Sequence, residues 1–272
     1  MAPHLSWTLS PAVLAGAVLV AAVYVRRFAS VRAAAGDRAG ADAPLWRLAC
    51  FAGSILLALA ALVSPLDSLA DQLFVMHMLQ HVLLLDLVPI LAILGLGKVI
   101  LRPVTRVVHR IESRAGMLAH PVAAVVLYVG VIWGWHIPAA YDLAVRHSGV
   151  HVLEHLSFLV AGSLYWWHLL SPIRARLRLD GLGSVIYMAS TKLVVGALGM
   201  GLAFAPSALY PYYVHHARVW GLSAIDDQAL AGITMAVEQS AVMGVALVAL
   251  FVRALGESER AEQRRERYEL PA

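Results

Sequence analysis

Long apolar stretches separated by short polar connections run through most of the chain. A helix that crosses the hydrocarbon core of a bilayer needs about 20 consecutive, mainly apolar residues. The stretches that meet this requirement are 9–25, 46–64, 74–95, 120–137, 151–170, 184–205 and 228–252. The pattern predicts an all-α, polytopic membrane protein with seven transmembrane helices in residues 1–253 and a charged cytoplasmic tail at 254–272.

Composition excludes a soluble alternative. Of the 272 residues, 60% are hydrophobic and 14% are charged, whereas a soluble domain carries about 25% charged residues. A single cysteine, Cys50, excludes an intrachain disulfide framework and a four-cysteine metal site.

The basic residues predict the orientation. Eighteen of the 21 lysines and arginines fall on one side of a seven-helix topology, in the connections near 26–47, 98–114 and 174–178 and in the tail. The opposite side has only Arg146 and Arg218. By the positive-inside rule, the N-terminus lies outside and the C-terminus is cytoplasmic. This topology accounts for the net charge of +4, so nucleic-acid binding has no support.

Two histidine dyads open two of the predicted helices. His77-Met-Leu-Gln-His81 opens the third and His151-Val-Leu-Glu-His155 opens the fifth, and a proline-containing turn precedes each. Residues four apart share one helix face. Both helices enter from the same side, so the two dyads lie at a similar depth, and His136 arrives from the helix between them. A lone interfacial histidine is more often bonded to a carbonyl or to water, but two matched pairs favour a metal site.

The sequence restricts the identity of the metal less than it restricts the position of the site. Imidazole ligands suit copper, zinc, iron and nickel, and the nearby methionines, Met78 and Met235 among them, shift the preference toward cuprous copper. Haem fits less well, because histidines about 6 Å apart along one helix suit one small ion.

The second dyad also has the order His-x-x-Glu-His, found in inverted zinc peptidases. An intramembrane zinc hydrolase with Glu154 as general base is therefore an alternative. The equivalent position in the first dyad is Gln80, which cannot act as a base. This difference favours metal binding, with Glu154 orienting a ligand.

Other ionisable residues lie at mid-membrane. An unpaired charge there costs roughly 2.5–3.5 kcal/mol, so Lys192 is expected to pair with Glu238 or with Asp86. The alternatives are a structural ion pair and an ion or proton pathway. Asp226 and Asp227 open the seventh helix; capping explains one carboxylate, and the other would attract or hand over a cation.

The histidine dyads, Trp135-His136-Ile-Pro138-Ala-Ala-Tyr141-Asp142 and Asp226-Asp227-Gln228-Ala-Leu-Ala-Gly232 together resemble the seven-helix CtaG-type cytochrome c oxidase assembly proteins associated with caa-type oxidases. The resemblance covers about residues 60–250. The chain departs from the family pattern at Met235-Ala-Val-Glu238, where a Met-Trp-x-Pro-like continuation is expected, and at Asp86, where an apolar residue is expected.

The resemblance implies a non-enzymatic chaperone of the bacterial inner or plasma membrane that delivers copper to an oxidase subunit. Its partners would be that subunit, the lipid bilayer and an extracytoplasmic copper donor. The metal residues carried over by the resemblance are His77, His81, His136, His151 and His155, with Asp226 and Asp227 nearby.

Overall fold

The computed structural model describes residues 2–173, 179, 182–216 and 218–269, and this part of the chain is all-helical with no β-strand. The long helices are α1 (Pro11–Ala35), α3 (Leu45–Val63), α5 (Phe74–Val82), α6 (Val88–Gly95), α9 (Pro121–Trp135), α11 (Ser148–Leu170), α12 (Leu182–Ala203) and α14 (Ala224–Glu269). The π-helical turn η2 (Leu83–Leu87) joins α5 to α6. Further helices connect them: η1 (Gly36–Arg38), α2 (Ala39–Asp42), α4 (Pro65–Ala70), α7 (Lys98–Leu101), α8 (Thr105–Ala115), η3 (Gly116–Ala119), α10 (Pro138–Arg146) and α13 (Pro211–Val214).

The predicted membrane character is confirmed, but the number of crossings is not settled. Five helical segments are long and apolar enough to span a bilayer: Pro11–Asp42, Leu45–Val63, Phe74–Gly95, Leu182–Ala203 and Ala224–Val252. A sixth is counted if Thr105–Ala119 and Pro121–Trp135, bent by 68°, form one span. Helix α11 is long enough, but its histidines and Glu154 lower its hydropathy. Seven crossings therefore remain a prediction.

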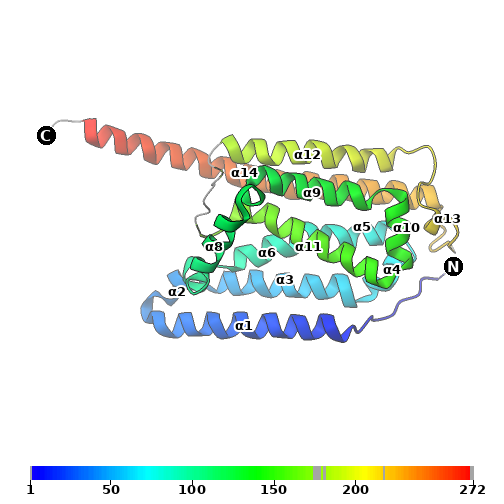
Figure 1. Ribbon diagram of the computed structural model, residues 1–272, viewed down its shortest axis with the longest axis horizontal. Helices are drawn as coiled ribbons and strands as arrows, with labels where there is room; N and C mark the ends of the chain where they lie inside the picture. Colours follow the sequence, from blue (N-terminus) through cyan, green and yellow to red (C-terminus); the bar gives the residue numbers. More distant parts are fainter. Residues whose placement is uncertain (1, 174–178, 180–181, 217, 270–272) are drawn as a thin grey trace.

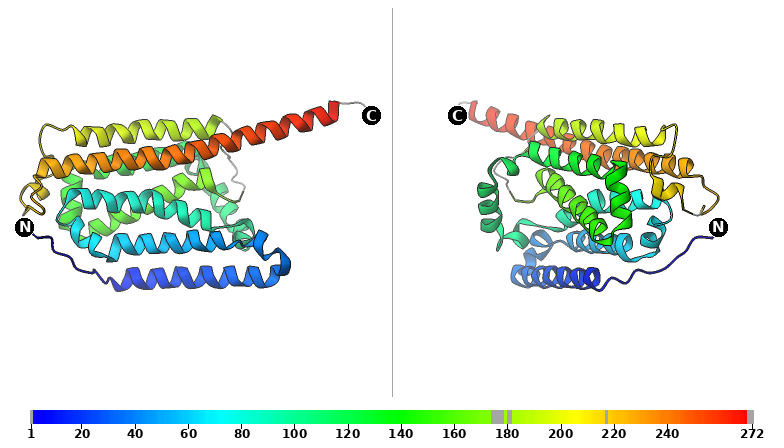
Figure 2. Two further views of the ribbon diagram at one scale, coloured as in Figure 1. Left: turned by 180° about the vertical axis from the view of Figure 1, so that it is seen from behind. Right: turned by 45° about the vertical axis from the view of Figure 1, so that its right-hand side comes forward.

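The long helices run along one axis, and the two ends of the chain lie at opposite ends of the bundle (Figures 1 and 2). Helix α14 continues beyond the other helices toward the C-terminus, so the predicted tail begins as an extension of the last long helix. The basic turn with Arg174, Arg176 and Arg178, which contributed to the predicted orientation, lies outside the described residues, as do residues 270–272.

The segment Phe74–Gly95 lies at the centre of the bundle. Of its most apolar stretch, 61% is buried, against 11–39% for the other four candidate spans. It packs against α3, α11 and α14. This position lets α5 face several helices at once, and the π-turn that follows is a form of helix common at functional sites.

A short helix that begins at a proline precedes each of the two helices that carry the dyads. The short helix α4 begins at Pro65 and precedes α5, and α10 begins at Pro138 and precedes α11. Proline is favoured in the first turn of a helix, where its missing N–H leaves no bond unmade. The similarity between the two dyads thus extends to the helices that precede them.

A glycine sets the approach of α11 to the central segment. A Cβ added at Gly162 would overlap the backbone carbonyl of Leu85 in η2. Replacing Gly162 by Ala is expected to destabilise the protein by about 1–3 kcal/mol through overpacking and to separate the two dyads. Thermal unfolding in detergent measures the effect. Gly130→Ala, which meets no atom within 4 Å, is the matched control, and equal melting temperatures for the two variants would contradict this role.

Candidate metal centre

Helices α5 and α11 place the two dyads face to face. The ring centroids of His77 and His151 are 5.1 Å apart, those of His77 and His155 are 6.1 Å apart, and those of His81 and His155 are 5.6 Å apart. The structure thus brings the two predicted dyads together. The dyads lie in the first turns of α5 and α11, and α4 and α10, which directly precede these helices, lie with α13 at one end of the bundle (Figure 1).

Four side chains offer metal ligands within a small volume. One ring nitrogen each of His77, His151 and His155 and one carboxylate oxygen of Glu154 all lie within 4.8 Å of one another. We call these four residues the His–Glu cluster. Glu154 lies among the donors, a position that the sequence did not indicate, since it predicted either an orienting role or that of a general base.

The donor atoms of the cluster lack partners among the described residues. The Nε2 atoms of the three histidines and both carboxylate oxygens of Glu154 are buried and make no hydrogen bond. Glu154 Oε2 lies 3.7 Å from His77 Nε2, and Oε1 lies 3.6 Å from His81 Nε2, too far for hydrogen bonds. A buried carboxylate without a partner is costly. A cation held between these atoms would remove that cost, so the residues fit a metal.

Tyrosines orient His77. The Tyr213 hydroxyl donates to the Ala70 carbonyl at 2.7 Å and lies 3.3 Å from His77 Nδ1. Burial raises the pKa of Tyr213 well above its ordinary value, so the hydroxyl keeps its proton. It therefore accepts from Nδ1–H, which leaves the Nε2 lone pair of His77 directed into the cluster. Ligating histidines usually have such a partner on the other nitrogen.

The sequence did not indicate that Tyr141 and Tyr213 lie together beside His77. Tyr141 belongs to the motif around His136, and its hydroxyl lies 3.1 Å from that of Tyr213. Its place in that motif is the only feature of the sequence that indicated a role for Tyr141. Nothing in the local pattern of Tyr213 indicated that α13 would reach His77.

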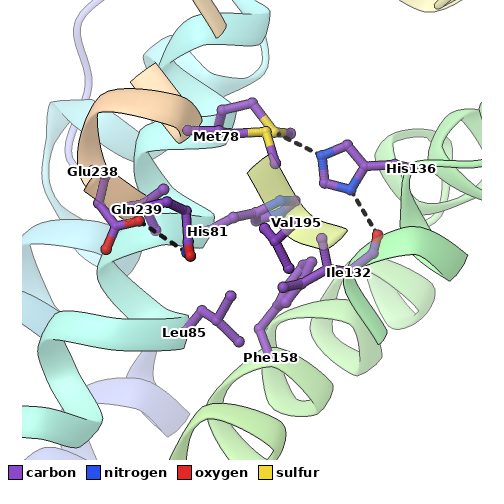
Figure 3. A pocket seen from close by; sticks show the side chains of 11 residues that line it. Met78, His81, Leu85, Ile132, His136, Phe158, Val195, Glu238 and Gln239 are labelled. Atoms are coloured by element: carbon purple, nitrogen blue, oxygen red, sulfur yellow. Dashed lines mark hydrogen bonds between the residues drawn. The ribbon is translucent and has the colours of Figure 1, made fainter. Parts of the chain in front are cut away.

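His81 lies beside the cluster. It is 4% exposed, and both of its ring nitrogens are buried without a hydrogen-bond partner among the described residues. His136 is separate: its Nε2 lies 3.2 Å from Met78 Sδ, and its Nδ1 lies 2.7 Å from the Ile132 carbonyl (Figure 3). The structure thus brings together three of the five predicted histidines, places His81 next to them and puts His136 in an adjoining cavity with Met235.

The two aspartates at the start of α14 act as caps. Asp226 accepts from the Ser223 hydroxyl at 2.5 Å and is exposed. Asp227 is buried and accepts from the backbone N–H groups of Phe74 at 2.7 Å and Val75 at 3.0 Å. Both carboxylates are therefore engaged in helix capping, and the expectation that one hands over a cation gains no support.

Asp227 anchors the helix that carries His77 and His81. Replacing it by Ala is expected to cost about 0.5–2 kcal/mol, the usual loss for a helix cap, and to weaken metal binding by letting α5 shift. Thermal unfolding and metal titration measure both effects. Asp226→Ala removes a cap from α14 only, so metal binding as weak in that variant as in Asp227→Ala would contradict the anchoring role.

The predicted ion pair of Lys192 is wrong. Its ammonium lies 3.4 Å from the Gln239 carbonyl oxygen, and the described residues include no salt bridge from it to Asp86 or Glu238. Asp86 is fully buried and is bound instead by Tyr128 at 2.8 and 2.9 Å and Trp166 at 2.6 Å.

Gln239 links the two carboxyl groups at mid-membrane. Its Nε2 lies 3.2 Å from Asp86 Oδ2 and 3.1 Å from Glu238 Oε2. The carboxyl group of Asp86 is thus held by neutral hydrogen-bond donors, which stabilise it without a paired cation.

The sequence is similar to those of one family of known proteins. The family model described as "Cytochrome c oxidase caa3 assembly factor (Caa3_CtaG)" matches residues 22–257. An uncharacterized protein of Mycobacterium leprae is 23% identical over 280 residues, and one of Mycobacterium bovis is 26% identical over 283 residues. Each alignment covers 96% of this chain, which spans 41% of the length of either relative. No solved structure matches the chain.

Proposed function

The chain belongs to the cytochrome c oxidase caa3 assembly factor family, and on this premise we propose that it binds copper in the His–Glu cluster and delivers it to an oxidase subunit. The observation that carries the proposal is the convergence of buried ligand atoms without hydrogen-bond partners. Copper would be the cargo of the protein, held by His77, His151, Glu154 and His155 until the oxidase receives it.

The ligand types limit the range of metals that the site would bind but do not select one metal. Imidazoles with one carboxylate suit zinc as well as copper, and the family's association with an oxidase favours copper. Zinc bound for hydrolysis would need Glu154 free to activate a water. Glu154 instead lies among the imidazoles, within 3.7 Å of His77 and 3.6 Å of His81, a place suited to a ligand. We therefore favour a non-enzymatic role.

The proposal includes the orientation of the chain in the membrane. The basic connections would be cytoplasmic, the N-terminus outside, and the helices would cross the bacterial inner or plasma membrane seven times. The His–Glu cluster would then lie in the outer half of the membrane, where an extracytoplasmic donor can reach it. His151 is half-buried, whereas the other three members of the cluster are at most 9% exposed, so His151 would meet the incoming ion first.

Complementation tests the function. Cells that lack this protein should assemble an oxidase deficient in copper, and the wild-type chain should restore the copper content of the purified oxidase. The His77→Ala/His155→Ala variant should fail to restore it, although it reaches the membrane in equal amount. The matched control is His4→Ala/His109→Ala, in which both histidines are exposed. A copper-replete oxidase in cells carrying the cluster variant would overturn the proposal.

A further inference from the structure

A small cavity adjoins the His–Glu cluster at His81, which lines it and lies 3.6 Å from Glu154. Its volume is about 20 Å³, room for one ion or one water molecule. The polar or sulfur atoms of its lining come from His81, His136, Met78, Met235, Glu238 and Gln239, and the remaining lining is apolar. Figure 3 shows the imidazole of His136 between the sulfur of Met78 and the carbonyl oxygen of Ile132.

The hydrogen bond to Ile132 fixes the protonation of His136. A carbonyl oxygen only accepts, so at 2.7 Å the Nδ1 atom carries the proton. In the neutral ring, Nε2 is then a lone pair, and it lies 3.2 Å from Met78 Sδ. A ring protonated at both nitrogens would place a positive charge in a pocket where His136 is 7% exposed and Met78 fully buried, which is unfavourable.

The contact between His136 and Met78 therefore joins two acceptors. A thioether sulfur has no proton to donate, so no hydrogen lies between Nε2 and Sδ. Two soft donor atoms that face each other in this way are a ligand pair for a soft cation. The Nδ1 bond to a backbone carbonyl is also the usual support of a ligating histidine.

We propose that His136 and Met78 form a second site, which takes a cuprous ion from the His–Glu cluster by way of His81. This inference rests on the proposed function and extends it to a route within the protein. His81 lines the cavity and also lies 3.6 Å from Glu154, and both of its ring nitrogens lack partners among the described residues. It can thus contact an ion in either site.

The surroundings favour a monovalent ion at the second site. Leu85, Ile132, Phe158 and Val195 line the cavity beside a single carboxyl group, that of Glu238, so one carboxylate could offset a single charge but not a double one. The thioether selects cuprous copper over zinc. The first site has no sulfur donor and suits either ion, so the second would act as a filter.

Anaerobic titration of the purified, full-length protein with cuprous ion, followed by copper X-ray absorption, tests the proposal. The wild-type protein should bind two copper ions and show sulfur scattering. Met78→Leu, which keeps the side-chain volume nearly unchanged, should bind one copper ion without sulfur scattering. The matched control is Met188→Leu, another buried methionine that does not line the cavity, which should behave like the wild type.

The outcomes separate this inference from the proposed function. Copper held only by nitrogen and oxygen, with equal binding in the wild type and Met78→Leu, would overturn the second site alone. Failure of the wild type to bind copper would overturn both. In the His77→Ala/His155→Ala variant, one remaining copper ion with sulfur scattering would support the second site.

Discussion

Replacing His77 and His155 together by Ala is expected to abolish copper binding at the His–Glu cluster. The double variant removes two of three imidazoles and leaves His151 and Glu154 as donors. Loss of supporting groups alone costs about 10–100-fold in metal affinity, so the loss of two ligands should exceed about 100-fold. Competition with a chromophoric cuprous chelator measures the change.

The variant is not expected to unfold. His77 and His155 each carry a buried nitrogen without a hydrogen-bond partner among the described residues, so their removal takes away an unfavourable burial along with some packing. His4→Ala/His109→Ala controls for the number of histidines changed. Unchanged copper affinity in a folded His77→Ala/His155→Ala protein would refute the site.

Replacing Glu154 by Gln is expected to weaken copper binding by about 10–100-fold while leaving the metal-free protein at least as stable. The change preserves the shape of the side chain and removes a buried carboxyl group that has no partner among the described residues. In the metal-free protein the ionised form of that group is unfavourable, and in the loaded protein it attracts the cation. Metal titration and thermal unfolding with and without copper measure the two effects.

This variant also separates binding from hydrolysis. A zinc hydrolase with Glu154 as general base would keep its metal in Glu154→Gln and lose only its turnover. Glu112→Gln, at the other end of the bundle from the cluster, is the matched control. Full metal affinity together with lost function in Glu154→Gln would favour the hydrolase.

The helices and the histidine dyads could be predicted because both depend on local periodicity. Residues four apart share a helix face wherever the helix lies, and the residue count along an apolar stretch gives the depth of a side chain. His77, His81, His151 and His155 were therefore found together. The family could also be predicted, because its motifs lie on several helices in a fixed order.

The rotation of each helix about its axis could not be predicted, because packing determines it. Lys192 and Glu238 have similar depths, yet Lys192 points to the Gln239 carbonyl. His136 has a depth suited to the cluster but faces Met78. Contacts between distant segments were missed for the same reason: Asp227 caps α5 from 152 residues away along the chain, and Tyr213 reaches His77 from α13.

Transfer of copper to the oxidase tests the central claim most directly. The full-length protein, loaded with isotopically labelled cuprous ion and reconstituted in liposomes, would be mixed with the copper-free oxidase subunit, and the label on each protein would then be measured after separation. We predict that the label moves to the subunit in the presence of a chelator that captures free copper, and that Glu154→Gln delivers less. Label that stays on the loaded protein, or that reaches the chelator before the subunit, would contradict delivery by this protein.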